Sequence, residues 1–231
     1  MQFPTQPEAV EVDLRRSAVV VVDMQNAFAT KGGMFDLSGM DISGARQVID
    51  VQKEVLRVAR EAALLVVYLV MGYDKNLCTG GGPDSPNSHK ELALRLMKKR
   101  PELQGKVLTQ GQWDWEVVDE LRPQPGDVVI DKTRYSGFCG TPLDSVLRTR
   151  GIKTLFFVGI ATNICVESTL RDAFFLDYWP ILLRDATMQA GPLVLQEATI
   201  RNVELALGWT LSSSEFVQGI QAVTPAIQCT A

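Results

Sequence analysis

Short runs of apolar, mostly β-branched residues recur along the chain and stop at charged or turn-forming residues. The first is Ala18-Val19-Val20-Val21-Val22, which ends at Asp23. A continuous apolar run of this length is typical of a strand buried on both faces of a parallel sheet. The pattern recurs at residues 64–70, 127–130, 154–158, 180–183 and 209–211. We therefore expect about five or six strands.

Stretches with a helical spacing of apolar residues lie between these runs. They are Ala45 to Ala63, Pro142 to Arg150, Cys165 to Leu176 and Val194 to Leu207. Because strands and helices alternate, the pattern predicts a mostly parallel sheet that is covered by helices on both faces.

Residues 72–111 break this alternation. The segment contains Gly80-Gly81-Gly82-Pro83, followed by a strongly charged helical stretch from Glu91 to Arg100. A long irregular connection in a compact domain is often functional. We expect it to be an excursion that covers a pocket. No repeat or linker is visible, so residues 1–231 are expected to form a single domain.

Composition and charge exclude several kinds of partner. The chain has 231 residues, 46% of them hydrophobic, and a net charge of -4 with dispersed basic residues. This charge gives no attraction for a polyanion, so we expect no nucleic-acid partner. No apolar run reaches the roughly 18 residues that span a bilayer, and the first residues do not resemble a signal peptide. We expect a cytoplasmic protein with no membrane association.

Cysteine and histidine limit the possible chemistry further. Cys78, Cys139, Cys165 and Cys229 have the spacing neither of a disulfide framework nor of a zinc site. His89 is the only histidine, so a site that needs two imidazoles cannot form, and a Cys-His or Ser-His-Asp site would have to include His89. We expect no metal or other cofactor.

Three predicted strand ends carry polar residues that suit catalysis. Asp23 follows the valine run, Lys132 follows the run at 127–130, and Cys165 opens the helix after the run at 154–158. Taken singly, Asp23 could cap a helix, Lys132 could belong to a charged loop, and Cys165 could be a buried thiol without a catalytic role. Helix amino termini and nearby cations favour a thiolate. Because parallel strand ends share one sheet edge, the three predict a nucleophile, a base and a cation together.

Three segments resemble the isochorismatase-like cysteine hydrolases: residues 20–25, the Lys132 segment, and Gly159-Ile160-Ala161-Thr162-Asn163-Ile164-Cys165-Val166. The resemblance covers nearly the whole chain. It implies a three-layer α/β/α sandwich with a mainly parallel six-stranded sheet, and a catalytic triad of Asp23, Lys132 and Cys165. It also implies a cis peptide before Ala161, an oxyanion hole formed by the amides of Ala161 and Cys165, and a homo-oligomer, either a dimer or a tetramer.

Within this family the chain is most similar to the ureidoacrylate amidohydrolases of pyrimidine degradation, through residues 126–172. The resemblance implies hydrolysis of a ureido C–N bond through a thioester or thiocarbamate on Cys165. The branch has polar residues at the positions of Phe28, Val70, Met71 and Met188, so biuret, triuret or another N-carbamoyl compound is an alternative substrate. A catalytically silent scaffold is the non-enzyme alternative. The candidate substrate-binding residues are Phe28, Met71, Tyr73, Asn87, Arg134 and Tyr135.

Overall fold

The computed structural model describes residues 1–228, and Cys229 lies outside them. Six strands form one sheet in the order β5-β4-β3-β6-β7-β8. All five neighbouring pairs are parallel. This architecture confirms the predicted α/β fold. The strands are β3 (Ser17–Val22), β4 (Leu65–Met71), β5 (Val128–Lys132), β6 (Thr154–Ile160), β7 (Trp179–Met188) and β8 (Trp209–Leu211).

The central strand β3 shows why the sheet needs helices on both faces, because all six of its residues are buried. Val19 and Val21 belong to the core that contains apolar residues of α3 (Ala45–Glu61) and α9 (Ser213–Gln228). Ala18, Val20 and Val22 point to the opposite face and join the core formed with α6 (Leu143–Thr149) and α7 (Glu167–Phe175). The alternation of side chains along a strand thus produces three layers.

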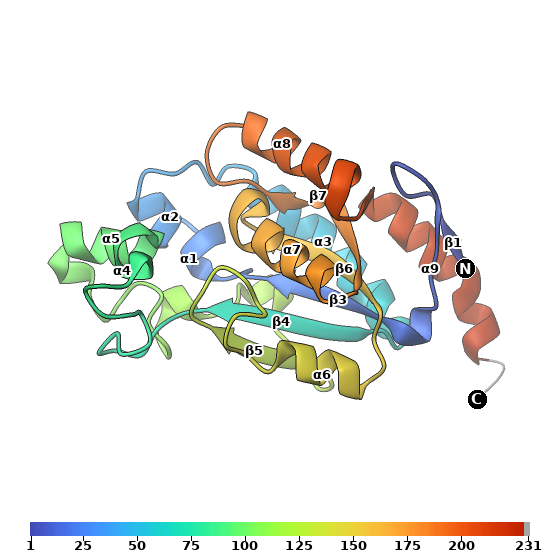
Figure 1. Cartoon of the computed structure of the whole chain (residues 1–231), viewed down its shortest axis with the longest axis horizontal. Helices are drawn as coiled ribbons and strands as arrows, with labels where there is room; N and C mark the ends of the chain where they lie inside the picture. The colour runs from blue at the N-terminus through green and yellow to red at the C-terminus, as the bar shows by residue number, and fades with distance from the viewer. Residues whose placement is uncertain (229–231) are drawn as a thin grey trace.

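The remaining elements lie mostly around the ends of the sheet. In Figure 1, α4 and α5 lie at the opposite end of the molecule from β1 and α9. None of the helices in the described part of the chain has the length and apolar character to cross a membrane. These further elements are β1 (Gln2–Phe3), β2 (Val10–Glu11), α1 (Asn26–Ala29), α2 (Met34–Leu37), α4 (Pro86–Lys90), α5 (Leu92–Lys99) and α8 (Val194–Asn202). Short 3-10 helices cover Leu14–Arg16, Pro101–Leu103, Trp113–Trp115 and Asp119–Leu121, and π-helical turns cover Thr162–Val166 and Val203–Leu207.

Several boundaries differ from those that the sequence pattern predicts. Strand β5 continues to Lys132 because its polar end still pairs with Met71 of β4. The helix expected to begin at Cys165 begins at Glu167, and Cys165 lies in the preceding π-helical turn. The pattern did not indicate β1, β2 or α9. The hydrophobic pattern does not predict where a strand ends when its last residues are polar, because those residues pair through their backbone and not through apolar side chains.

Candidate active site

The ends of β3, β5 and β6 bring the three predicted catalytic residues together. The chain adds β4 and β5 on one side of β3 and then returns to place β6 on the other side. Ligands in open parallel sheets bind at such a switch point, beyond the carboxyl ends of the strands. Asp23 directly follows β3, Cys165 lies in the turn after β6, and Lys132 is the last residue of β5.

Lys132 reaches across the end of β4 to Asp23. Its Nζ atom donates a hydrogen bond to Asp23 Oδ2 at 2.8 Å, and both side chains are fully buried. The same atom lies 3.6 Å from the sulfur of Met71, and it donates to the carbonyl oxygen of Arg134 at 3.2 Å. A buried ion pair of this kind needs such additional partners, because desolvation of both charges opposes their attraction.

Asp23 holds its carboxylate toward Cys165 from an unusual backbone conformation. Its φ angle is 52°, in the left-handed region, and its N–H donates to the carbonyl of Leu69 at 2.9 Å. Among the described residues, Asp23 Oδ1 has no hydrogen-bond partner of standard geometry. The Cys165 thiol interacts with both Asp23 and Lys132. The carboxylate therefore keeps an acceptor oxygen beside a thiol.

Burial determines the protonation state of this cluster. Burial and the charge of Asp23 raise the pKa of the Cys165 thiol well above its usual value, against the effect of Lys132. The expectation that the position of Cys165 favours its ionisation is therefore wrong. Burial also raises the pKa of Asp23, with Lys132 opposing. For Lys132, burial lowers the pKa, but the charges of Asp23 and Cys165 outweigh it and the pKa is raised. The resting cysteine is a thiol.

Backbone contacts fix the turn that carries Cys165. The Cys165 carbonyl accepts a hydrogen bond from Thr169 Oγ1 at 2.6 Å. The same Thr169 Oγ1 atom accepts a hydrogen bond from the N–H of Gly137 at 3.0 Å. The turn is thereby joined to the loop after Lys132. The Ile160–Ala161 peptide is cis, as the resemblance implied.

Gly159 is required where β6 approaches β3 most closely. Its φ angle is 133°, and a Cβ atom at this position would lie 2.1 Å from the carbonyl oxygen of Val22. A side chain at this position would push apart the two strands that carry Asp23 and Cys165.

A narrow cavity opens at Cys165, and three of the six predicted substrate-binding residues line it. These are Phe28, Met71 and Tyr135. The other three, Tyr73, Asn87 and Arg134, are not among the lining residues. Asn87 Nδ2 donates to Tyr73 Oη at 3.3 Å and to the Gly80 carbonyl at 2.8 Å. Arg134 Nη1 donates to the carbonyls of Thr79 and Thr133. Their side chains hold the 72–111 segment together and attach it to β5.

Glu91 also lines the cavity, although the sequence pattern gave it no role. Its side chain is buried, and its two carboxylate oxygens accept hydrogen bonds from the amides of Ala93 at 3.1 Å and Leu94 at 2.8 Å. Burial raises the pKa of this carboxyl, and the two amides oppose the shift. An acidic residue just before a helix is a recognisable cap signal. That it faces Cys165 depends on how the 72–111 segment packs.

Gln25 is a second residue whose role the sequence did not reveal. It is fully buried, and its Nε2 atom donates to the carbonyls of Met71 and Trp115 at 2.9 and 2.6 Å. Its Oε1 atom accepts a hydrogen bond from the Met71 amide at 2.9 Å. Gln25 thus fixes the end of β4, over which Lys132 reaches.

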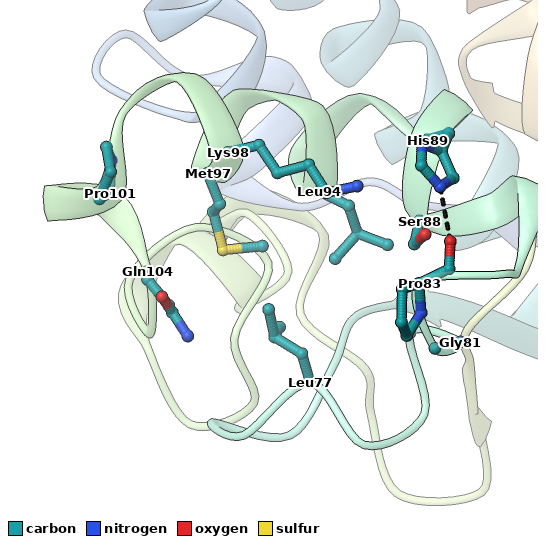
Figure 2. A pocket seen from close by; sticks show the side chains of 12 residues that line it. Leu77, Gly81, Pro83, Ser88, His89, Leu94, Met97, Lys98, Pro101 and Gln104 are labelled. Atoms are coloured by element: carbon teal, nitrogen blue, oxygen red, sulfur yellow. Dashed lines mark hydrogen bonds between the residues drawn. The ribbon is translucent and has the colours of Figure 1, made fainter.

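A wider pocket, of about 470 Å³, lies away from this cluster. Figure 2 shows it between the 77–83 loop and α5, with Leu77, Leu94 and Met97 in its wall. His89 is exposed there, with its Nε2 atom 2.6 Å from the Pro83 carbonyl. None of the three clustered residues lines this pocket. Across residues 1–228, no three His, Cys, Asp or Glu side chains are grouped to hold a metal ion.

Comparisons with known proteins agree with this geometry. An isochorismatase domain model matches residues 17–215. The ureidoacrylate amidohydrolase RutB of Caulobacter segnis is 56% identical over 216 residues, which cover 94% of this chain and 90% of that protein. The enzyme of the same name from Agrobacterium fabrum is 53% identical over 225 residues, 97% of this chain and 99% of that one.

Solved structures show the same fold. A cysteine hydrolase from Pseudomonas syringae pv. phaseolicola superposes with a TM-score of 0.76 at 28% identity, covering 91% of this chain and 95% of that one. An N-carbamoylsarcosine amidase from Thermoplasma acidophilum gives a TM-score of 0.64 at 28% identity, covering 86% and 96%.

Proposed function

This chain belongs to the isochorismatase family of hydrolases, and we propose that it is an amidohydrolase that cleaves ureidoacrylate with Cys165 as its nucleophile. The observation that carries the proposal is the buried contact of Asp23 with Lys132 and Cys165 at the switch point of the sheet. The high identity to ureidoacrylate amidohydrolases over nearly the whole chain supports this choice of substrate.

The first step is a proton transfer from Cys165 to Asp23. The resting thiol is protonated, and the neighbouring carboxylate has an oxygen free to accept. Lys132 keeps Asp23 ionised until the proton moves and then stabilises the new thiolate by direct attraction. A positioned base of this kind accelerates reactions by about 10²–10⁴-fold.

The thiolate sulfur then attacks the ureido carbonyl carbon. The C–N bond to the acrylate nitrogen breaks, and the proton on Asp23 passes to that nitrogen, which leaves as an amine. A thiocarbamate remains on Cys165. Water, deprotonated by Asp23, attacks this carbonyl and the C–S bond breaks. The proton on Asp23 returns to the departing sulfur of Cys165, which restores the resting thiol, and the released carbamate decomposes to ammonia and carbon dioxide.

The oxyanion that forms during each attack needs donors. We assign this role to the backbone amides of Ala161 and Cys165. Both residues line the cavity, where the π-helical turn begins. Each donor of this type contributes about 2.7–4 kcal/mol to transition-state stabilisation in comparable sites.

The 72–111 segment is proposed to cover the substrate. Glu91 and Leu92, at the start of α5, line the cavity together with Cys165. Closure of such a segment excludes water from the thiocarbamate.

We also propose a homo-oligomer, a dimer or a tetramer. Leu193, Val194 and Leu205 leave 62%, 61% and 84% of their surface exposed, which is typical of an interface. Light scattering coupled to size exclusion tests this assembly. Leu205→Glu is expected to yield monomer, and a wild-type monomer contradicts the proposal.

The assay for the proposed function is ammonia release from ureidoacrylate. Cys165→Ala is expected to abolish turnover. Cys139→Ala is the matched control, because Cys139 is exposed and is expected to be dispensable. Full activity in Cys165→Ala refutes the assignment of the nucleophile.

A further inference from the structure

Thr169 is a fully buried residue of α7 that takes no direct part in the proposed chemistry. Its Oγ1 atom donates a hydrogen bond to the Cys165 carbonyl at 2.6 Å and accepts one from the Gly137 N–H at 3.0 Å. A threonine hydroxyl can do both, because it has one donor hydrogen and two acceptor lone pairs. A single hydroxyl group therefore bonds both to the residue that carries the nucleophile and to the loop after Lys132.

That loop, residues 133–138, reaches the catalytic cluster at two points. The Arg134 carbonyl accepts a hydrogen bond from Lys132 Nζ at 3.2 Å. The next residue, Tyr135, lines the Cys165 cavity. The position of the loop therefore determines one contact of Lys132 and one wall of the cavity.

Two side chains of α7 attach the loop to the helix. Thr169 accepts the Gly137 N–H, and Asp172 accepts a hydrogen bond from Ser136 Oγ. Thr169 and Asp172 are three residues apart, so they lie on the same face of α7. On its other side the loop packs tightly against β4, because a Cβ atom on Gly137 would lie 2.3 Å from Cδ1 of Leu69. The loop is thus held between α7 and the sheet.

Loss of the Thr169 hydroxyl would remove this partner from two buried backbone groups, the Cys165 carbonyl and the Gly137 N–H. Such groups are costly to leave unpaired, so the turn and the loop would shift to find other partners. A nucleophile must be closely aligned with the carbon that it attacks, and a displacement of about 1 Å can lower the rate about 10²-fold. A hydroxyl group that touches no substrate atom can therefore control the rate of attack.

We propose that Thr169 is a positioning residue, which holds the Cys165 turn and the Tyr135 loop in the alignment that attack on the substrate carbonyl requires. The inference rests on the proposed function and deepens it. It concerns the rate of attack on ureidoacrylate and not the choice of substrate, because Thr169 is not among the residues that line the cavity.

The first test compares Thr169→Val with Thr169→Ser by ammonia release from ureidoacrylate. Valine keeps the shape of threonine and lacks the hydroxyl, whereas serine keeps the hydroxyl and lacks the methyl group. With kcat normalised to folded protein by circular dichroism, Thr169→Val is expected to lower kcat about 10²-fold and to change KM less than about threefold. Thr169→Ser is expected to restore most of the lost activity. A Thr169→Val variant with wild-type kcat, or a Thr169→Ser variant as slow as Thr169→Val, overturns the inference.

Thr5→Val is the matched control. Thr5 is also buried, and its Oγ1 atom donates to a backbone carbonyl, that of Glu8, at the same distance of 2.6 Å. It lies in the connection between β1 and β2 and does not line the Cys165 cavity. This variant is expected to keep the wild-type kcat while its melting temperature falls. A loss of kcat equal to that of Thr169→Val overturns the inference, because it would follow from the loss of any buried hydroxyl.

The second test measures the step itself. Excess enzyme is mixed with ureidoacrylate and quenched in acid at short times, and mass spectrometry follows the carbamoyl group on Cys165. The rate constant for its formation is expected to fall about 10²-fold in Thr169→Val, in parallel with kcat. An unchanged rate constant overturns the inference, because the loss would then lie in the later attack by water. Failure of the proposed function has a different signature, namely no ammonia release by the wild type or full turnover in Cys165→Ala.

Discussion

Replacing Lys132 by Met removes the only cation that contacts Asp23 among the described residues and leaves a buried carboxylate without its partner. At 2.8 Å and an effective dielectric constant near 20, the lost attraction is about 6 kcal/mol. The variant limits this cost by protonating Asp23. From the ordinary value of 3.8, protonation at pH 7 costs about 4 kcal/mol at 1.36 kcal/mol per pKa unit. We expect the free energy of unfolding at pH 7 to fall by about 3–4 kcal/mol, within the range for broken buried pairs.

The pH dependence of this loss has a definite sign. Burial already raises the pKa of Asp23, and removing Lys132 removes the main opposing effect, so the folded-state pKa rises further. An acid whose pKa is higher in the folded state binds more protons there, so stability falls as pH rises. Between the folded-state pKa values of wild type and variant, the deficit of Lys132→Met is therefore expected to grow by about 1.4 kcal/mol per pH unit.

Activity is expected to follow the same titration. A protonated Asp23 cannot accept the thiol proton, so kcat of Lys132→Met is expected to fall at least about 10³-fold at pH 7, with a smaller change in KM. Urea unfolding at pH 5, 6 and 7 and ammonia release are the assays, with exposed Lys153→Met as the control. Stability equal to the wild type at pH 7, or a deficit that shrinks as pH rises, refutes the reasoning.

Three further substitutions test the frame around the site. Asp23→Asn is expected to lower kcat by about 10²–10⁴-fold because the base is lost, and full activity in the ammonia assay excludes Asp23 as the base. Gly159→Ala is expected to destabilise the fold by about 2 kcal/mol or more, because the added Cβ meets the Val22 carbonyl. Thermal unfolding measures this loss. Gly82→Ala is the control, because a Cβ at that position meets nothing within 4 Å. Gln25→Ala leaves buried backbone groups of Met71 unpaired, so urea unfolding is expected to show a loss of about 1–3 kcal/mol, and an unchanged midpoint argues against its role.

The sheet and the cluster at its edge were predictable because their signals are local. The valines of β3 and the polar residues that end β3 and β5 are readable from a few neighbouring positions, and parallel pairing brings their ends together. The position of Cys165 after β6 followed in the same way. Its protonation did not, because the pKa depends on burial by side chains from distant parts of the chain.

The substrate pocket was less predictable for the same physical reason. Arg134 was a candidate substrate-binding residue, but in the structure its guanidinium group donates to the carbonyls of Thr79 and Thr133. Glu91 sits in a charged stretch typical of an exposed helix, and only the packing of residues 72–111 turns it toward Cys165. Irregular connections carry no periodic pattern that predicts which of their side chains point inward.

The covalent intermediate on Cys165 is the central claim, and mass spectrometry tests it most directly. Wild-type protein is mixed with ureidoacrylate, quenched in acid during turnover and digested. The mechanism predicts a carbamoyl group on the peptide that contains Cys165, none on the peptide that contains Cys139, and none on either peptide in Cys165→Ala. Turnover without any adduct on Cys165, or a carbamoyl group that persists in Cys165→Ala, contradicts the mechanism.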